Sequence, residues 1–150
     1  MAVRRMASAA PAGTVLGFDF GTERIGVAVG ETRVGVAHPL TTLANRRGNE
    51  HFADIAALIA EWRPVLLLVG LPTHADGTPH AMTARARRFA EQLRGRFALP
   101  VAFGDERFTT QDAALALRDA TARARDRKSV RDQVAAQLLL QAYLDAHVTA

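Results

Sequence analysis

Hydrophobic and polar positions in the first third of the chain follow the pattern of short strands. Residues 14–20 and 25–29 are apolar and rich in β-favouring side chains, and a glycine-containing turn at 21–24 separates them, which predicts a hairpin. A third apolar run, 34–37, ends at His38 and Pro39. Because the connections are short, we expect these runs to form an antiparallel meander.

The pattern then changes to a helical period. Phe52, Ile55, Ile59 and Trp62 recur at helical spacing after Asn49, a candidate cap, and predict a helix that ends at Arg63-Pro64. The remaining pattern predicts a central strand at 65–69, a helix over about 80–94, a strand at 100–103, a helix from Thr109 or Thr110 to about 120, and a last helix over about 130–146. The charged segment 121–129 has almost no large apolar residues, so we expect it to be mobile.

Leading strands followed by alternating helices and strands predict an α/β fold with a mixed five-stranded sheet flanked by helices. The length of 150 residues suits one domain, which we expect at 13–148 after a flexible N-terminal tail at 1–12. The longest continuous apolar run, 65–69, is far shorter than the roughly 20 residues of a membrane span. We therefore expect a soluble protein that does not enter a membrane.

The composition favours an anionic partner. The net charge is only +4, but 18 of the 19 basic residues are arginines, whose planar guanidinium suits phosphate oxygens. A solvated arginine-rich surface is the alternative. The absence of cysteine excludes disulfides, thiolate nucleophiles and cysteine-ligated metal centres.

The first candidate for chemistry is Asp19, a carboxylate in an apolar strand. Burying it is costly unless a cation meets it, and a divalent metal ion would do so. Gly21 would let a phosphate or metal approach the backbone, and Arg24, just past the turn, could point toward the same place. The alternative is an aspartate that hydrogen-bonds the hairpin turn.

Two further carboxylates occupy suitable places. Asp105 and Glu106 follow a short apolar strand and precede a helix, but on alternating strand geometry at most one of them serves the same site as Asp19. Asp132 lies near the start of the last predicted helix, on the face that carries Ala136 and Leu139 and should pack on the sheet. Helix capping, or a surface aspartate in a first turn, is the alternative for these acids. The lone His74 is best explained as a surface residue.

Carboxylates on three separate elements, Asp19, Glu106 and Asp132, suit hydrolysis of a phosphodiester by paired divalent ions, with Mg²⁺ or Mn²⁺ selected by the hard oxygen ligands. No nucleophilic serine motif, zinc helix or P-loop is present. The residues that we expect to contact substrate are Gly21, Arg24, Arg107, Thr109 and Lys128. The basic residues Arg123, Arg125, Arg127, Lys128 and Arg131 would grip a nucleic-acid backbone, or else form a solvated linker.

Several blocks of sequence, in order, resemble the YqgF family, also called RuvX and related to the RuvC resolvases. The blocks are 16–28, 37–42, 69–72 with 76–78, 105–110, and Lys128 with 132–136 and 140–145. The resemblance implies a ribonuclease H-like fold and a nuclease site in which Asp19, Glu106 and Asp132 bind metal. It also implies a cytoplasmic protein that processes the 5′ end of the precursor of 16S ribosomal RNA. Arg131 departs from the aliphatic residue usual in the family, but helix periodicity turns it outward.

The substrate stays open between structured RNA and branched DNA, and the protein is expected to be a monomer or a weak homodimer. A Holliday junction resolvase would need a dimer to cut two strands symmetrically. A non-catalytic nucleic-acid binding module is the second alternative, and it predicts binding that survives loss of Asp19. Sugar and acetate kinases use an Asp-x-Gly turn on a related fold, but they need two such domains and this chain supplies one.

Overall fold

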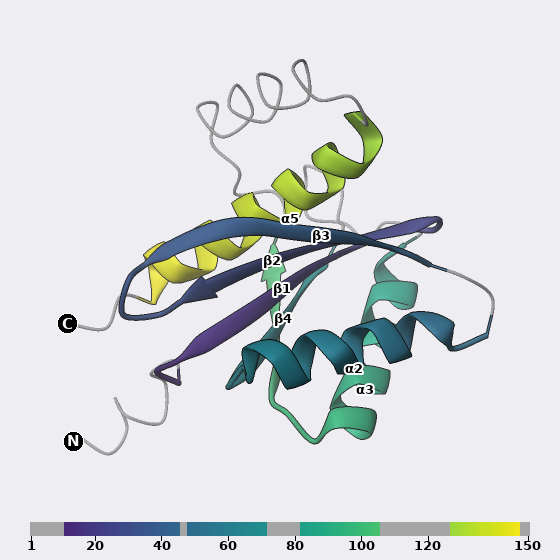
Figure 1. Ribbon diagram of the computed structural model, residues 1–150, viewed down its shortest axis with the longest axis horizontal. Helices are drawn as coiled ribbons and strands as arrows, with labels where there is room; N and C mark the ends of the chain where they lie inside the picture. The colour runs from purple at the N-terminus through teal and green to yellow at the C-terminus, as the bar shows by residue number, and fades with distance from the viewer. Residues whose placement is uncertain (1–10, 46–47, 72–81, 106–126, 148–150) are drawn as a thin grey trace.

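The computed structural model describes residues 11–45, 48–71, 82–105 and 127–147 (Figure 1). The elements in chain order are β1 (Thr14–Phe20), β2 (Arg24–Glu31), β3 (Val36–Ala44), α2 (Glu50–Trp62), β4 (Leu66–Leu71), α3 (Thr83–Phe97), β5 (Val101–Asp105) and α5 (Arg127–Ala146). In this part of the chain no helix is long and apolar enough to cross a membrane. The helix expected to begin at Thr109 or Thr110, residues 121–126, His74 and most of the expected tail lie outside the described residues.

The strands form one mixed sheet in the order β3-β2-β1-β4-β5. β1 and β2 pair antiparallel, as do β2 and β3, which confirms the predicted meander. β4 lies parallel to β1, and β5 lies parallel to β4. The carboxyl ends of β1, β4 and β5 therefore meet at one edge of the sheet, where ligands bind in open α/β sheets.

The prediction that the third strand ends at His38 and Pro39 was wrong. β3 begins at Val36 and continues through Pro39 to Ala44. Two circumstances allow the proline: β3 is an edge strand, and the register against β2 shifts between Val27 and Ala28, opposite Pro39. A proline lacks the backbone N–H that a central strand would need, but an edge strand with an irregularity tolerates it.

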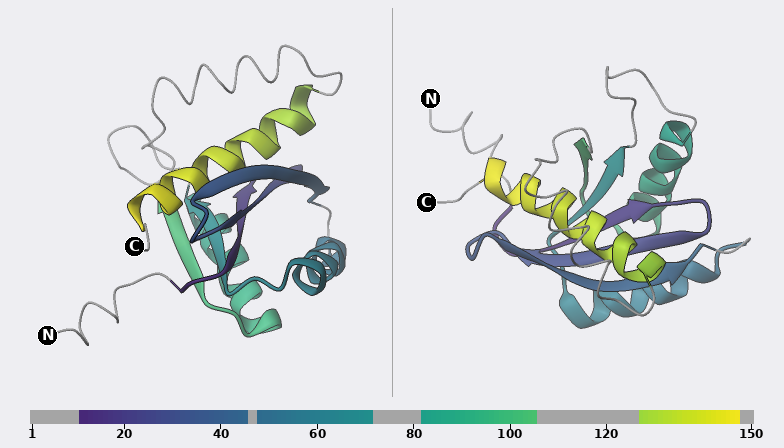
Figure 2. Two further views of the ribbon diagram at one scale, coloured as in Figure 1. Left: turned by 60° about the vertical axis from the view of Figure 1, so that its left-hand side comes forward. Right: turned by 90° about the horizontal axis from the view of Figure 1, so that it is seen from above.

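Helices cover both faces of the sheet (Figures 1 and 2). α2 and α3 lie on one face, where Phe18 of β1 packs with Ile55 of α2 and Phe89 of α3 in the larger buried cluster. On the other face α5 crosses the strands obliquely, and its Leu140 and Leu144 form a second cluster with residues of β1, β2 and β4. The sheet is thus the middle layer between two hydrophobic cores.

The face of the sheet beneath α5 carries glycines where the helix approaches. A Cβ on Gly17 would lie 3.2 Å from the Cβ of Leu140, and a Cβ on Gly104 would lie 2.6 Å from a methyl of Leu139. On Gly30 it would lie 2.9 Å from a methyl of Leu144. These missing side chains let α5 lie close to the strands.

Two glutamines of α5 cover the outer edge of β3. Gln141 accepts a hydrogen bond from the backbone amide of Ala37 at 2.9 Å and donates one to the carbonyl of Gly35 at 2.8 Å. Gln137 donates to the carbonyl of Ala37 at 3.1 Å. Side-chain amides therefore take the place of a neighbouring strand at this part of the edge.

The last helix begins earlier than its hydrophobic pattern predicts. α5 starts at Arg127, so the expected start at about residue 130 was three residues too late. Asp132 is therefore in the second turn of α5 and not in the first, which removes helix capping as the explanation for this carboxylate. Arg131 is exposed, as the helix periodicity indicated.

Candidate functional site

Asp19 lies near the carboxyl end of β1 and is half-buried. Its partner in the antiparallel register is Gly26 of β2. Gly17, two residues earlier in β1, faces α5, and side chains alternate along a strand. The side chain of Asp19 therefore lies on the face of the sheet that α5 covers.

Gly26 brings Asp132 to the same place. A Cβ on Gly26 would lie 1.9 Å from the carbonyl oxygen of Asp132 and 3.1 Å from the Cβ of that residue. The backbone of α5 thus rests on β2 at the position directly opposite Asp19. Because directly paired residues of antiparallel strands have Cβ atoms about 4.5–5.5 Å apart, Asp19 and Asp132 lie on the same face of the sheet at the same point of the β1–β2 pair.

Arg24 holds the carboxylate of Asp132. Its Nε donates to Oδ2 of Asp132 at 2.6 Å, across 108 positions of sequence. The two side chains are 31% and 21% exposed, so the pair is only partly screened by water. Arg24 Nη1 also lies 3.5 Å from Glu23, whose side chain is largely exposed. The predicted substrate-binding residue Arg24 is therefore a direct partner of a predicted metal ligand.

The turn between β1 and β2 sets the position of Arg24. The amide of Gly21 donates to the carbonyl of Arg24 at 2.9 Å, and a Cβ on Gly21 would lie 2.7 Å from that oxygen. Asn45, which directly follows β3, fixes the turn through two hydrogen bonds. Its side-chain nitrogen donates to the carbonyl of Gly21 at 2.6 Å, and its backbone N–H donates to the carbonyl of Glu23 at 2.8 Å. Sequence reasoning missed Asn45, which no periodic pattern marks out.

The structure describes only a part of the other predicted site residues. Glu106, Arg107 and Thr109 lie outside the described residues, and so does the side chain of Lys128, although its backbone belongs to α5. Glu106 directly follows β5, whose last residue, Asp105, pairs with Leu71 at the end of β4. Among the described residues no group of three or more histidines and carboxylates is arranged to hold a metal ion.

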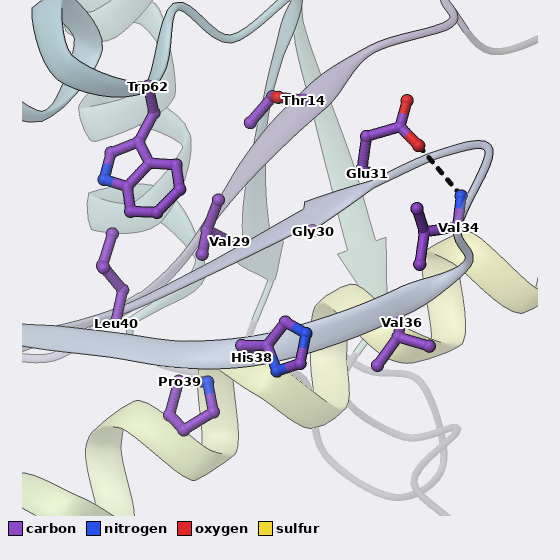
Figure 3. A pocket seen from close by; sticks show the side chains of 10 residues that line it. All are labelled: Thr14, Val29, Gly30, Glu31, Val34, Val36, His38, Pro39, Leu40 and Trp62. Carbon is purple, nitrogen blue, oxygen red and sulfur yellow. Dashed lines mark hydrogen bonds between the residues drawn. The ribbon is translucent and has the colours of Figure 1, made fainter.

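An apolar groove of about 350 Å³ lies at the opposite end of β1 (Figure 3). Its lining includes Thr14 at the start of β1, Trp62 at the end of α2 and Leu40 of β3. Figure 3 shows the carboxylate of Glu31 bonded to the backbone amide of Val34 at 2.9 Å, so this acid stabilises its own hairpin. The groove lacks the carboxylate chemistry of the Asp19 site and lies at the other end of the strand.

The fold is that of ribonuclease H-like resolvases, which confirms the predicted fold class. Thermus thermophilus RuvC in complex with a Holliday junction substrate matches with a TM-score of 0.53 at 17% identity, over 89% of this chain and 94% of that one. The fowlpox virus resolvase in complex with Holliday junction DNA matches with a TM-score of 0.56 at 8% identity, over 91% and 99%. At these identities the likeness shows the fold alone.

Sequence comparison gives the family. The model of the RuvX family, described as Holliday junction resolvase, matches residues 13–146. A protein of Nitrosospira multiformis is 54% identical over 139 residues, 93% of this chain and 92% of its own length, and is named "Putative pre-16S rRNA nuclease". A protein of Dechloromonas aromatica with the same name is 54% identical over 134 residues, 89% of this chain and 92% of its own length. The chain belongs to the RuvX family of nucleases, as its motifs indicated.

Proposed function

We propose that this chain is a metal-dependent nuclease that hydrolyses a phosphodiester bond near the 5′ end of the 16S ribosomal RNA precursor, in the cytoplasm. The observation that carries the proposal is the meeting of Asp19 and Asp132 over Gly26, next to the guanidinium of Arg24. Two partly buried carboxylates on one face of a sheet need positive charge nearby. A nuclease supplies that charge with its metal ion, which also binds the substrate phosphate. The name that the relatives share supports an RNA substrate.

The donor set fits a hard divalent cation. Asp19 and Asp132 offer carboxylate oxygens on two elements, and Glu106, which follows β5 in the sequence, is the third ligand of the proposal. A bound Mg²⁺ or Mn²⁺ would supply an activated water and charge stabilisation of the leaving oxygen. Arg24 bonds to Asp132 and balances its charge, so this carboxylate is held in place before a metal arrives.

The proposed substrate contacts surround these acids. The turn that begins at Gly21 brings backbone close to the site without a side chain in the way, and Arg24 is half-buried beside it. We assign phosphate contacts to Arg24, Arg107 and Lys128, and contacts to the neighbouring backbone to Gly21 and Thr109. The protein would work as a single domain, 13–148, and as a monomer or weak homodimer.

Resolution of four-way DNA junctions is the second candidate. The description of the RuvX family favours it, and so does the likeness of the fold to resolvases. Symmetric cutting of two strands needs a dimer related by a two-fold axis. Sedimentation in the presence of a junction therefore tests the candidate independently of cleavage.

The deciding experiment compares cleavage of a 5′-extended 16S rRNA precursor and of a four-way DNA junction in Mg²⁺ or Mn²⁺. Asp19→Asn and Asp132→Asn should each abolish cleavage, as chelation should. Asp54→Asn is the matched control, because Asp54 is an exposed aspartate of α2 on the other face of the sheet. Cutting of RNA alone selects the first candidate, and cutting of the junction alone selects the second. If neither is cut while the variants still bind, the chain is a binding module and the metal site is wrong.

A further inference from the structure

A polar cavity of about 380 Å³ opens on the face of the sheet opposite the Asp19 site. Phe20, which follows Asp19 in β1, lines it, and the ring of Phe20 packs against that of Phe89 with 4.8 Å between centroids. Adjacent residues of a strand point to opposite faces. The cavity is therefore one residue away from the proposed catalytic carboxylate, across the edge of the sheet.

One wall of the cavity is cationic. Arg85 and Arg88 line it from α3, and Gln92 follows one turn later on the same helix face. Among the described residues, none that lines the cavity is acidic and neither arginine pairs with a carboxylate. Two exposed guanidinium groups that no described carboxylate neutralises favour an anionic ligand.

A buried imidazole from α2 also lines the cavity. His51 of α2 lines the cavity and is only 6% exposed, and its Nδ1 has no hydrogen-bond partner among the described residues. Burial, and then the positive charge of Arg96, lower the pKa of His51, which keeps the ring neutral near pH 7. A neutral imidazole has one donor and one acceptor nitrogen. Nδ1 is enclosed by protein atoms, so a polar ligand group in the cavity would have to bond to Nε2.

The cavity is connected to the catalytic turn through a shared residue. Asn45 lines it and also holds the carbonyl of Gly21 at 2.6 Å, in the turn that positions Arg24. The cavity and the turn at Gly21 therefore lie next to each other at the carboxyl end of β1.

We propose that the cavity binds a nucleotide of the substrate strand adjacent to the cleaved bond, with its phosphate on Arg85 and Arg88 and a polar edge of its base or ribose on His51. This inference rests on the proposed function, because it extends the path of the strand from the Asp19 site. It adds a binding subsite on the other face of the sheet, built from the ends of β1, β3, α2 and α3.

The test measures the affinity of a fluorescein-labelled single-stranded RNA oligonucleotide by anisotropy in EDTA, so that binding is read without cleavage. Arg85→Gln with Arg88→Gln should weaken binding about tenfold and lower the slope of log affinity against log salt by roughly 0.7 for each phosphate that the protein no longer neutralises. The control, Arg33→Gln with Arg63→Gln, removes the same charge from exposed residues at the other end of the molecule and should change affinity less than about twofold. Equal weakening by the two double variants would overturn the proposal.

A second variant tests His51. His51→Phe keeps a ring of similar size but removes both nitrogens, so RNA affinity should fall about threefold while the melting temperature is kept. A lower melting temperature with unchanged affinity would assign His51 a structural role and remove it from the subsite.

Two further arms separate the remaining explanations. If AMP binds the wild type tightly while the loss of Arg85 and Arg88 leaves RNA binding unchanged, the cavity takes a free nucleotide and the proposal is wrong. Cleavage is scored separately with Asp19→Asn. Failure of the wild type to cut any substrate would refute the nuclease, whereas selective loss of RNA binding in the Arg85 and Arg88 variant would still establish the cavity as an RNA-binding site.

Discussion

Replacement of Gly26 by alanine would test how closely α5 must approach the sheet. The added Cβ would lie 1.9 Å from the carbonyl oxygen of Asp132 and 2.4 Å from its carbonyl carbon, whereas ordinary contacts begin at 3.4 Å. The backbone of α5 would have to retreat by about 1.5 Å, because a main-chain oxygen cannot rotate away as a side chain can. The retreat carries Asp132 away from Asp19 and strains its bond to Arg24.

We expect two measurable effects of Gly26→Ala. Overpacking of this kind costs about 1–3 kcal/mol, which urea unfolding would show as a lower free energy of unfolding. Misplacement of a catalytic group by about 1 Å can lower a rate on the order of 100-fold, so cleavage of the precursor RNA should nearly vanish. A titration with Mn²⁺, monitored by electron paramagnetic resonance, should show weaker metal binding in the same variant.

Gly30→Ala is the matched control. Gly30 lies on the same strand and faces the same helix, but the nearest atom to its added Cβ is a methyl of Leu144, 2.9 Å away at the end of a flexible side chain. Stability should fall there too, while cleavage by the folded enzyme is retained. Full activity of Gly26→Ala, or an equal loss of activity in both variants, would refute the idea that Gly26 sets the distance between the carboxylates.

Three further predictions concern individual side chains. Arg24→Gln leaves the partly buried carboxylate of Asp132 without its cation, so thermal unfolding at low salt should show a loss on the order of 1 kcal/mol that shrinks as salt is added; a loss independent of salt would contradict the ion pair. For His51, the unfolded chain has the ordinary pKa of 6.5 and the folded chain a lower one, so the unfolded state takes up the proton first and stability should fall as the pH drops below about 6.5. The variant His51→Phe should have a flatter profile of unfolding free energy against pH, and an unchanged profile would show that other groups cause the slope. Gln141→Leu removes the bonds to Ala37 and Gly35 at the edge of β3 and should cost roughly 1 kcal/mol for each bond in urea unfolding, with concentration-dependent association as the second sign.

Local pattern was sufficient to predict most of the sheet. The glycine turn after Phe20 and the apolar runs around it indicate the β1 and β2 hairpin, and the continuous apolar run before Gly70 indicates the buried β4. The path of β3 was not predictable from the same rules, because Pro39 normally ends a strand. Only the position of β3 at the sheet edge, a property of the whole fold, makes the proline acceptable.

In the candidate site, too, local features were predictable and long-range contacts were not. Asp19 and Asp132 could be proposed as site residues from local context and family motifs, but the bond between Arg24 and Asp132 spans 108 positions and no sequence period encodes it. The early start of α5 at Arg127 was missed because a helix extends into polar residues once its packed part has formed. His51 was missed because it occupies a helical position without an apolar or motif signature.

The position of α5 in the chain fixes when the proposed site can first exist. β1, β2 and the turn at Gly21 are complete after the first third of synthesis, but Asp132 reaches Gly26 only after α5 has been made and has docked on the finished sheet. Because domains fold as units during synthesis, a ribosome still making this helix carries a chain in which Asp132 has not yet reached Asp19 and Arg24. The nascent protein therefore passes through translation without the proposed site assembled, and any activity of that site begins with the folding of α5.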